Sequence, residues 1–316
     1  MKKLIIYLLL FVSFQHLYAQ DEAIFSHYLV NPQLINPAFT GFNGKQNINM
    51  NIRSGYISFP GTPKTYSLSW NGPVTEHIGL GALILTENIS SFKRFKGQLS
   101  YAYRYQLENM KFSIGLSTEF HQMRVSNGIF NNVEVDPNDN SLIDITNGVK
   151  YFDASLGVMG EYNSLYFGLS APNLVQARLN STSNTSGDSD TKLFSYVVAQ
   201  VGNRFNLKTN GIVLDPSIVL RKVKNSPLFV DFNVKASFLN NKLISGITYR
   251  AGTGGGIGLM IGTRLNSMGL FYTFDSSFQR FQSYNGGSHE FTINFELGKG
   301  ANSKKTGRGL SKPKKR

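Results

Sequence analysis

Four histidines lie beyond the apolar first residues of the chain, and histidine is the side chain that most often acts as a base or a metal ligand near neutral pH. A metal site needs such ligands at short, fixed spacing, and nucleophilic catalysis needs a base beside a nucleophile. The four residues instead fall in separate segments, at His27, His77, His121 and His289. Ser288 precedes His289, but no nucleophile elbow accompanies the pair. We therefore expect structural or loop histidines, no metal and no enzyme activity.

Two further stretches resemble ligand loops at first sight. Asp136, Asn138 and Asn140 have the opening spacing of a calcium loop, but Ser141 and Asn147 replace the required glycine and glutamate. The glycine-rich stretch 252–262 lacks the lysine and the following helix of a phosphate-binding loop. The chain has no cysteine, which excludes disulfides, thiolate zinc sites and a cysteine nucleophile. We expect a polar surface loop at 136–147 and no cofactor.

The elements that must position these residues follow a period of two almost everywhere. Apolar and polar side chains alternate over 99–107, 112–121, 230–238 and 290–297. In the last stretch the apolar face consists of Phe291, Ile293, Phe295 and Leu297. Successive side chains of a strand point to opposite faces, so each strand has one apolar and one polar face. This pattern is typical of a transmembrane β-barrel, and it also occurs in a soluble sandwich.

The first residues indicate export. Lys2 and Lys3 precede the apolar run Leu4–Phe14, and Ala19 ends the segment. These are the parts of a secretory signal peptide, which we place at residues 1–19. No later run is long and apolar enough for a transmembrane helix. We therefore predict an exported protein of the outer membrane.

The lengths of the connections separate the barrel from the sandwich. About fourteen strands are expected, at 46–54, 63–70, 77–86, 97–107, 110–123, 150–162, 164–170, 192–205, 213–223, 228–239, 242–250, 256–264, 267–275 and 288–297. Tight turns at Glu108–Asn109, Asn163, Asn240–Asn241 and Asn266–Ser267 all fall at one rim, and the long loops 124–149, 171–191 and 276–287 fall at the other. Short periplasmic turns and long external loops are the asymmetry of an outer-membrane barrel. We predict an all-β antiparallel barrel over 46–297 with both termini periplasmic.

Two segments lie outside this predicted barrel. Residues 20–45 contain Asn31–Pro32 and Asn36–Pro37, which favour turns, so this segment either plugs the barrel, docks on its rim or only leads into the first strand. The net charge of +13 comes largely from residues 298–316, which carry eight of the 32 basic residues. Such a basic tail is usually solvated and disordered. The rest of the exported chain is nearly balanced, so we expect no nucleic-acid partner.

Several stretches resemble the PorP/SprF family of type IX secretion and gliding proteins of Bacteroidota. They are Gln20–Asp21, Phe25–Tyr28, Asn31–Pro32, Ile35–Gly41, Gly61–Thr65, Tyr101–Arg104, Tyr166–Leu174 and Gly287–Glu290. Ser54–Tyr56 departs from the Gln-Trp that the family usually shows after the arginine, here Arg53. The resemblance implies an outer-membrane barrel in which the signature residues Asn31, Pro32, Asn36, Pro37 and Gly41 have a structural or plugging role.

The resemblance also implies a partner, and the residues leave a second function open. Such proteins deliver or hold a large surface adhesin through its type B C-terminal domain, alongside translocon or gliding proteins. The tail would then supply a periplasmic contact through Lys304, Lys305, Arg308, Lys312, Lys314, Lys315 and Arg316. The alternative is a pore for small solutes, lined by Arg53, Arg104, Lys235, Arg250 and Arg264.

Overall fold

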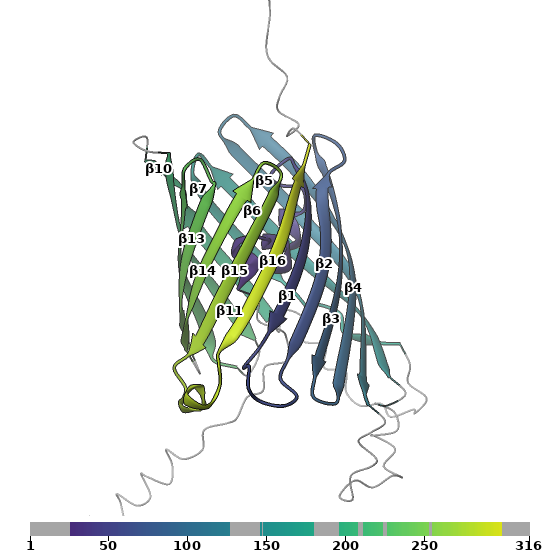
Figure 1. Cartoon of the computed structure of the whole chain (residues 1–316). Helices are drawn as coiled ribbons and strands as arrows, with labels where there is room; N and C mark the ends of the chain where they lie inside the picture. The colour runs from purple at the N-terminus through teal and green to yellow at the C-terminus, as the bar shows by residue number, and fades with distance from the viewer. Residues whose placement is uncertain are drawn as a thin grey trace, which may run out of the picture.

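A computed structural model describes residues 26–126, 146, 148–179, 196–207, 211–223, 226–252 and 255–298. Across these residues fourteen antiparallel strands close into one barrel (Figure 1). The ring runs from β1 to β7, continues through β9 and β11 to β16, and closes where β16 pairs with β1. Its strands are β1 (Gln46–Ser54), β2 (Lys64–Pro73), β3 (Ile78–Ile89), β4 (Phe92–Leu107), β5 (Met110–Val125), β6 (Val149–Tyr162), β7 (Leu165–Ala171), β9 (Tyr196–Asn203), β11 (Ile212–Val223), β12 (Leu228–Phe238), β13 (Leu243–Ala251), β14 (Gly256–Leu265), β15 (Met268–Ser277) and β16 (Ser288–Leu297).

Two short strands complete the sheet without adding to the ring. β10 (Phe205–Leu207) continues β9 along the same neighbour, β11, and β8 (Ala177–Arg178) pairs with β6. A single-turn helix, η5 (Arg280–Tyr284), lies between β15 and β16. The described residues contain no helix long and apolar enough to cross a membrane. The predicted strand order and count are therefore confirmed.

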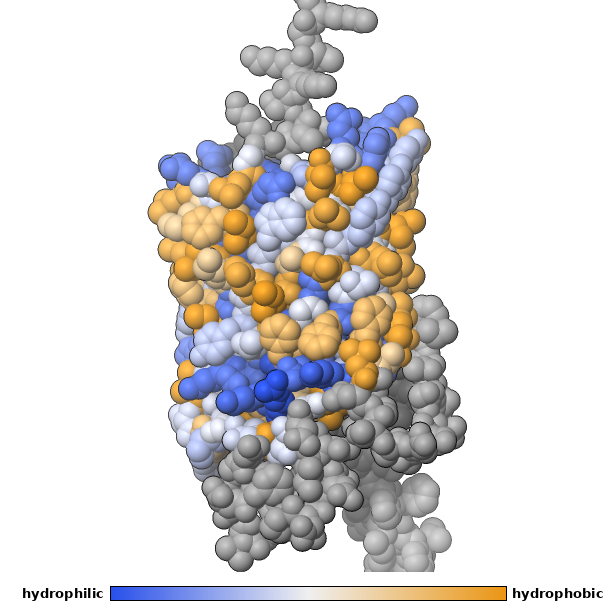
Figure 2. Space-filling model, turned by 90° about the vertical axis from the view of Figure 1, so that its right-hand side faces the viewer, coloured by the Kyte–Doolittle hydropathy of each residue, from blue (hydrophilic) through white to orange (hydrophobic). Residues whose placement is uncertain are grey.

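The alternation of side chains works as the sequence predicts. In β1, Met50 and Ile52 are about half exposed on the outside, whereas Asn49 and Asn51 are buried inside. Figure 2 shows hydrophobic residues gathered over the middle of the barrel wall, with hydrophilic residues towards its two ends. A closed barrel leaves no unpaired strand edge, so an apolar outer surface of this kind is compatible with lipid. The interior is mostly polar, and three small hydrophobic clusters lie where residues 28–42 pack against the inner wall.

The turns sort onto two rims, as predicted. Tight turns at Glu108–Asn109, Asn163–Ser164, Leu239–Lys242 and Asn266–Ser267 lie at the end where β16 finishes, which we call the short-turn rim (top of Figure 1). The backbone φ is 54° at both Asn163 and Asn266, a positive value that asparagine tolerates better than most residues, and it is 45° at Glu108. The opposite end is the long-loop rim; of its loops, residues 127–145 and 180–195 lie outside the described residues.

One connection differs from the prediction. The predicted strands 77–86 and 97–107 stop short of one another, but β3 and β4 continue through this gap and meet in a two-residue turn at Ser90–Ser91 on the long-loop rim. Charged Glu87 and Arg94 interrupt the apolar alternation, which is why the sequence pattern ends there. Both face the interior, where their side chains lie 3.7 Å apart, so the strands extend without burying an unpaired charge.

Residues 26–45 cross the interior of the barrel, and we call them the plug (Figure 1, purple). Three single turns, η1 (His27–Leu29), η2 (Pro32–Leu34) and η3 (Pro37–Phe39), build it, and the last two begin with proline, whose fixed φ suits a first helical position. Ser26 lies near the long-loop ends of β15 and β16, and the plug then runs to Lys45 at the short-turn rim.

This path refines the expectation for the N-terminal segment. The sequence left three alternatives open, a plug, a rim contact and a plain leader to the first strand, and the described part of the segment is a plug that begins near the long-loop rim and runs to the short-turn rim. The last described residue, Gly298, follows β16 at the short-turn rim. The two ends of the described chain therefore do not lie at one rim. The signal peptide 1–19, residues 20–25 and the tail 299–316 lie outside the described residues.

Candidate functional site: the plugged lumen

One wall of the lumen is lined by a row of small residues. Cross-strand pairing aligns Gly79 of β3, Ala102 of β4, Gly115 of β5, Gly157 of β6 and Ser170 of β7 in successive strands. All five point inward, since each has an adjacent large side chain that is exposed on the outside: Leu80, Tyr101, Ile114, Leu156 and Leu169. We call this alignment the small-residue row. It leaves room for main chain to approach the wall.

The plug fills that room. A β-carbon at Gly79 would lie 2.2 Å from the Thr40 carbonyl oxygen, and one at Gly115 would lie 2.3 Å from the Ala38 nitrogen. The Ser170 hydroxyl donates to the Ile35 carbonyl at 2.6 Å. Distances of this kind leave no space for any larger side chain. The small-residue row is therefore shaped to the backbone of the plug.

The opposite wall holds the plug with buried charge. Arg53 of β1 donates to Asp275 at 2.7 Å and to Glu290 at 2.9 Å, and the two carboxylates in turn bind the start of the plug. The Ser26 backbone nitrogen donates to Glu290 at 2.8 Å, and the Ser26 hydroxyl donates to Asp275 at 2.7 Å. Glu290 is fully buried. We call Arg53, Asp275 and Glu290, together with Asp231, Arg221 and Arg250 beside them, the charged wall.

His27 and Tyr28 extend the contact with the charged wall. The His27 ring lies between the hydroxyls of Thr292 and Thr273, with its Nε2 2.7 Å from Thr273. Burial lowers the pKa of His27, and nearby Glu290 partly opposes that effect. The Tyr28 hydroxyl donates to Asp231 at 2.9 Å, and burial raises the pKa of this phenol. Both side chains are held neutral in a polar interior.

The five family-signature residues all lie in the plug. Asn31 donates to the Ser69 hydroxyl at 2.9 Å. Asn36 accepts from the Ala38 nitrogen at 2.9 Å and donates to the Val158 carbonyl at 3.1 Å. Pro32 and Pro37 begin their helical turns, and Gly41 has a φ of 65°. A β-carbon at Gly41 would lie 2.8 Å from the backbone of β2, so this position requires glycine. Their role in the structure is to shape and dock the plug.

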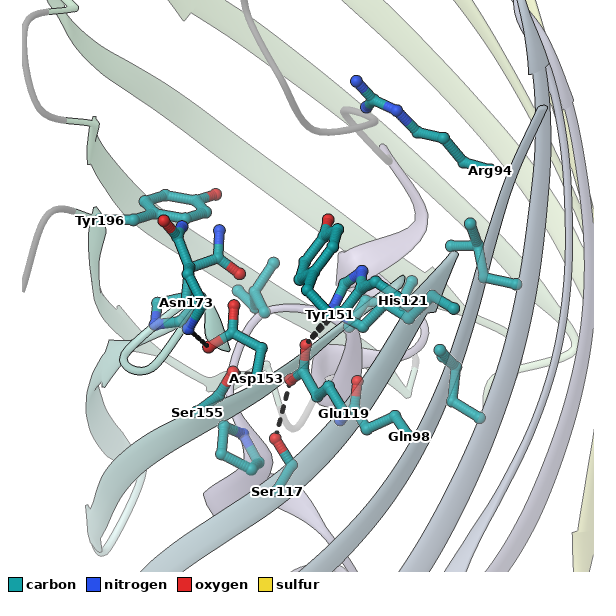
Figure 3. Close-up of a pocket in the computed structure, with 18 of the residues that line it drawn as sticks. Arg94, Gln98, Ser117, Glu119, His121, Tyr151, Asp153, Ser155, Asn173 and Tyr196 are labelled. Carbon is teal, nitrogen blue, oxygen red and sulfur yellow. Dashed lines mark hydrogen bonds and ion pairs between the residues drawn. The ribbon is translucent and has the colours of Figure 1, made fainter. Parts of the chain in front are cut away.

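A cavity of about 540 Å³ lies between the plug and the long-loop rim. We call it the long-loop chamber. Its floor is plug residues 33–37, and its walls are the inner faces of β3, β4, β5, β6 and β9 (Figure 3). It extends to the long-loop ends of β4, β5 and β6, where Phe95, Met123 and Val149 line it.

One cluster of side chains in the long-loop chamber forms around the carboxylate of Glu119. Lys96 lies 2.8 Å from Glu119, which also accepts hydrogen bonds from Ser117 and Ser155. His121 lies 3.1 Å from the same carboxylate, and its ring stacks on Tyr151 with centroids 4.6 Å apart (Figure 3).

Asp153, which also lines this chamber, binds to the backbone of the β7–β9 connection. Its carboxylate accepts hydrogen bonds from the backbone nitrogens of Val175 and Gln176. It therefore folds the start of the β7–β9 connection over the edge of the barrel. The same connection is also held to β6 by the pairing of β8 and by the hydrogen bond from the Leu174 nitrogen to the Ala154 carbonyl.

A second cavity of about 370 Å³ lies on the other side of the plug, towards the short-turn rim. We call it the short-turn chamber. Gln33 lines both cavities, so the plug separates them. Lys235 lies 3.2 Å from Asp215, and Arg264 pairs with Glu296. Within the described lumen these charges are again neutralised in pairs.

The five basic residues of the pore alternative all form ion pairs or hydrogen bonds within the protein. Arg53 and Arg250 belong to the charged wall, and Lys235 and Arg264 pair with acidic side chains. Arg104 donates to the carbonyl oxygens of Gly41 and Thr75. None of these five cations remains available to attract an anion.

The remaining histidines lie apart from one another. His77 stacks on Tyr103 and bonds the Arg104 carbonyl, and His289 lies 2.6 Å from the Tyr272 hydroxyl. In the part of the chain that the structure describes, no group of three or more potential ligands is placed to hold a metal. The calcium-like stretch 136–140 lies outside that part.

Sequence reasoning missed the small-residue row. It singled out the glycines of 252–262 instead, where Gly258 and Gly262 make room for the side chains of Asp275 and Phe271. The missed signal was glycine on the polar face of several successive strands, at Gly79, Gly115 and Gly157. It also missed Ser26, His27 and Tyr28 as residues that dock the plug, because their partners are distant in sequence.

The model of the family described as type IX secretion system membrane protein PorP/SprF matches residues 17–295. No curated protein matches the chain in sequence. Among solved structures, the outer membrane protein Omp33 of Acinetobacter baumannii is 6% identical with a TM-score of 0.45, over 81% of this chain and 100% of that one. KdgM porin is 9% identical with a TM-score of 0.36, over 80% and 99% of the two chains. BamA from Haemophilus ducreyi is 10% identical with a TM-score of 0.40, over 80% and 70%.

Proposed function

Because the chain belongs to the PorP/SprF family of type IX secretion system membrane proteins and forms an outer-membrane β-barrel, we propose that it holds a secreted surface protein at the cell surface. The partner is a large adhesin with a type B C-terminal domain, which docks on the long-loop rim. The role is non-enzymatic and belongs to the type IX secretion and gliding system. Loops carried on a rigid scaffold are where binding usually resides.

The observation that carries this proposal is the plugged lumen. The plug separates two chambers, and its backbone contacts the small-residue row too closely to leave a passage along that wall. Of the five basic residues of the pore alternative, four are ion-paired and Arg104 is hydrogen-bonded to backbone carbonyls. A barrel of this kind suits a rigid platform better than a conduit, which supports anchoring over the pore alternative.

Affinity purification of a tagged copy tests the proposal. The tag is placed at the C-terminus, and the co-purifying proteins of native outer membranes are identified by mass spectrometry. We expect a very large secreted surface protein, accompanied by translocon proteins. Recovery of the barrel alone, under conditions in which a known secretion complex survives, would contradict anchoring.

A recording in planar bilayers then tests the pore. The purified protein should give no steady conductance, because the plug and the paired charges close the interior. A steady, anion-selective current from the unchanged chain would favour the pore over the anchor.

For the basic tail we propose contact with the periplasmic machinery. This assigns the short-turn rim, from which β16 leads into the tail, to the periplasm. Removing residues 299–316 should weaken recovery of periplasmic or translocon proteins while the surface partner is retained. Normal adhesin display and motility in the truncated strain would refute this role.

A further inference from the structure

We propose that the long-loop chamber receives a short, extended end of the secreted partner's polypeptide, which inserts from the long-loop rim and stops on the plug. The inference rests on the proposed anchoring function and places part of the contact inside the barrel, below the loops. It commits to an uncharged peptide segment with apolar side chains. The reasons are the size, charge, hydrogen-bonding groups and closure of the chamber.

The chamber has the size of a binding site. Its volume of about 540 Å³ falls within the range of roughly 300–1,000 Å³ that is usual for sites that enclose a small ligand. A strand rises only about 3.3 Å per residue, so a few residues of extended chain fit such a space. A folded domain does not fit, and it must remain at the rim.

The balance of charge favours a neutral occupant. Three cationic side chains, Arg94, Lys96 and Arg221, line the chamber together with three anionic ones, Glu87, Glu119 and Asp153. Lys96 and Glu119 pair between neighbouring strands β4 and β5, and Arg221 pairs with Asp231 of the charged wall at 2.7 Å. A phosphate or a metal ion would have to displace these pairs and leave one charge of each buried without its partner.

Two amide side chains point to a peptide. Gln33 is 3% exposed, lines the chamber, and has no hydrogen-bond partner for its amide oxygen or nitrogen among the described residues. The buried Nε2 of Gln122 also has no partner there. Buried polar groups are nearly always satisfied, so these amides are available to bond a group that enters the chamber. A peptide group offers the matching donor and acceptor.

The apolar part of the lining favours a peptide over a carbohydrate. Leu34 and Ile35 form the floor, and Leu83, Leu85 and Val198 add aliphatic surface to the walls. Aliphatic side chains gain free energy when they bury other apolar groups, and a hydroxyl-covered sugar ring offers little of that surface. The ring of Tyr151, which would suit a sugar, is already stacked on His121.

The closed floor determines which part of a partner is able to insert. The plug is docked by the small-residue row on one side and by the charged wall on the other, so a chain cannot pass through. Only a chain end or a tight hairpin can insert and stop there. We commit to a chain end, because it needs half the width of a hairpin.

Photo-crosslinking from neighbouring residues of β3 tests the inference. Leu85 lines the chamber, whereas adjacent Ile84 is 52% exposed on the lipid-facing side. A benzophenone amino acid is placed at one or the other position in the full-length chain, in the native cell. We expect crosslinks from position 85 to the surface partner, mapping to one stretch at its terminus, and none from position 84. Crosslinks from Ser58 at the rim without any from 85 would place the partner on the loops alone and overturn the inference.

A chamber-filling variant provides the second measurement. Leu85→Trp should lower recovery of the surface partner by about tenfold, the factor that ~1.4 kcal/mol of binding free energy gives, while the matched control Ile84→Trp leaves it unchanged. Heat-modifiable migration of both variants checks that the barrel is folded. Equal recovery with both variants would overturn the inference, as would a crosslink from 85 to polysaccharide.

The two proposals fail in different ways. If the unchanged chain recovers no surface protein, the anchoring function itself is wrong. If the unchanged chain and Leu85→Trp recover it equally, anchoring stands and only the chamber assignment falls.

Discussion

The two walls of the lumen hold the same short plug by opposite physical means. On β3 to β7, glycine, alanine and serine let the plug backbone lie directly against the sheet, and the contact is one of shape. On β1 and β11 to β16, side chains that are buried and partly ion-paired form hydrogen bonds with Ser26, His27 and Tyr28. Close packing leaves no space for a larger side chain in the row, whereas removing one partner of a buried ion pair leaves the other charge buried and unpaired. The two walls should therefore respond differently to substitution.

The largest effect is expected on the charged wall. Arg53→Met leaves Asp275 and Glu290 without their shared cation, and breaking a buried pair in this way typically costs ~3–5 kcal/mol. The urea midpoint of the purified barrel should fall accordingly. Lys45→Met is the control, since the Lys45 side chain is 46% exposed and such pairs contribute at most ~1 kcal/mol. An equal, small effect of both substitutions would show that the charged wall does not hold the plug.

The second largest effect is expected from a substitution in the small-residue row. Gly115→Val places a β-carbon 2.3 Å from the Ala38 nitrogen, an overpacking that usually costs ~1–3 kcal/mol and is relieved most easily if the plug leaves the wall. We expect steady conductance in planar bilayers, which the unchanged chain should lack.

The matched control for this test is another strand glycine. The nearest atoms to a β-carbon at Gly97, which lies between the exposed residues Phe95 and Leu99, are 3.6 Å away in the Phe95 ring. Gly97→Val should stay closed. Conductance from Gly97→Val, or closure of Gly115→Val, would contradict the role of the row.

A smaller loss is expected at Tyr28. Tyr28→Phe removes hydrogen bonds to Asp231 and Asn233 but leaves Asp231 paired with Arg221, so the cost should be about 1 kcal/mol. Chemical unfolding of the variant against Tyr105→Phe, whose ring is exposed on the outside, measures it. Indistinguishable midpoints would remove Tyr28 from the set of residues that dock the plug.

The smallest expected effect is a dependence on pH. Because burial lowers the pKa of His27 below 6.5, folding favours its neutral form. The contribution to stability is present above pH 6.5 and is lost as the pH falls towards the lowered pKa. His27→Gln should flatten this part of the stability curve between about pH 7 and pH 5. An unchanged slope in the variant would assign the dependence to other groups.

Much of the fold could be predicted because it depends on local patterns. Alternation in segments such as 290–297 determines which side chains face lipid, and turn residues such as Asn266 mark where strands reverse. The predicted strands 77–86 and 97–107 were too short because the cross-strand pair of Glu87 and Arg94 permits charged residues inside the β3–β4 hairpin. The family-signature residues were recognised, but their contacts were not.

The sequence alone determined the compartment expected for the chain, the number and order of its strands, the sorting of its turns and the family it belongs to, since each follows from neighbouring residues. Only the tertiary structure decided what fills the barrel. Ser26 forms hydrogen bonds with Asp275 and Glu290, which lie some 250 positions later in the sequence. Position 115 needs glycine because the backbone of Ala38 in the plug lies directly against it. Such contacts exist only once the barrel has closed, because closure brings strands from opposite ends of the chain around one short segment.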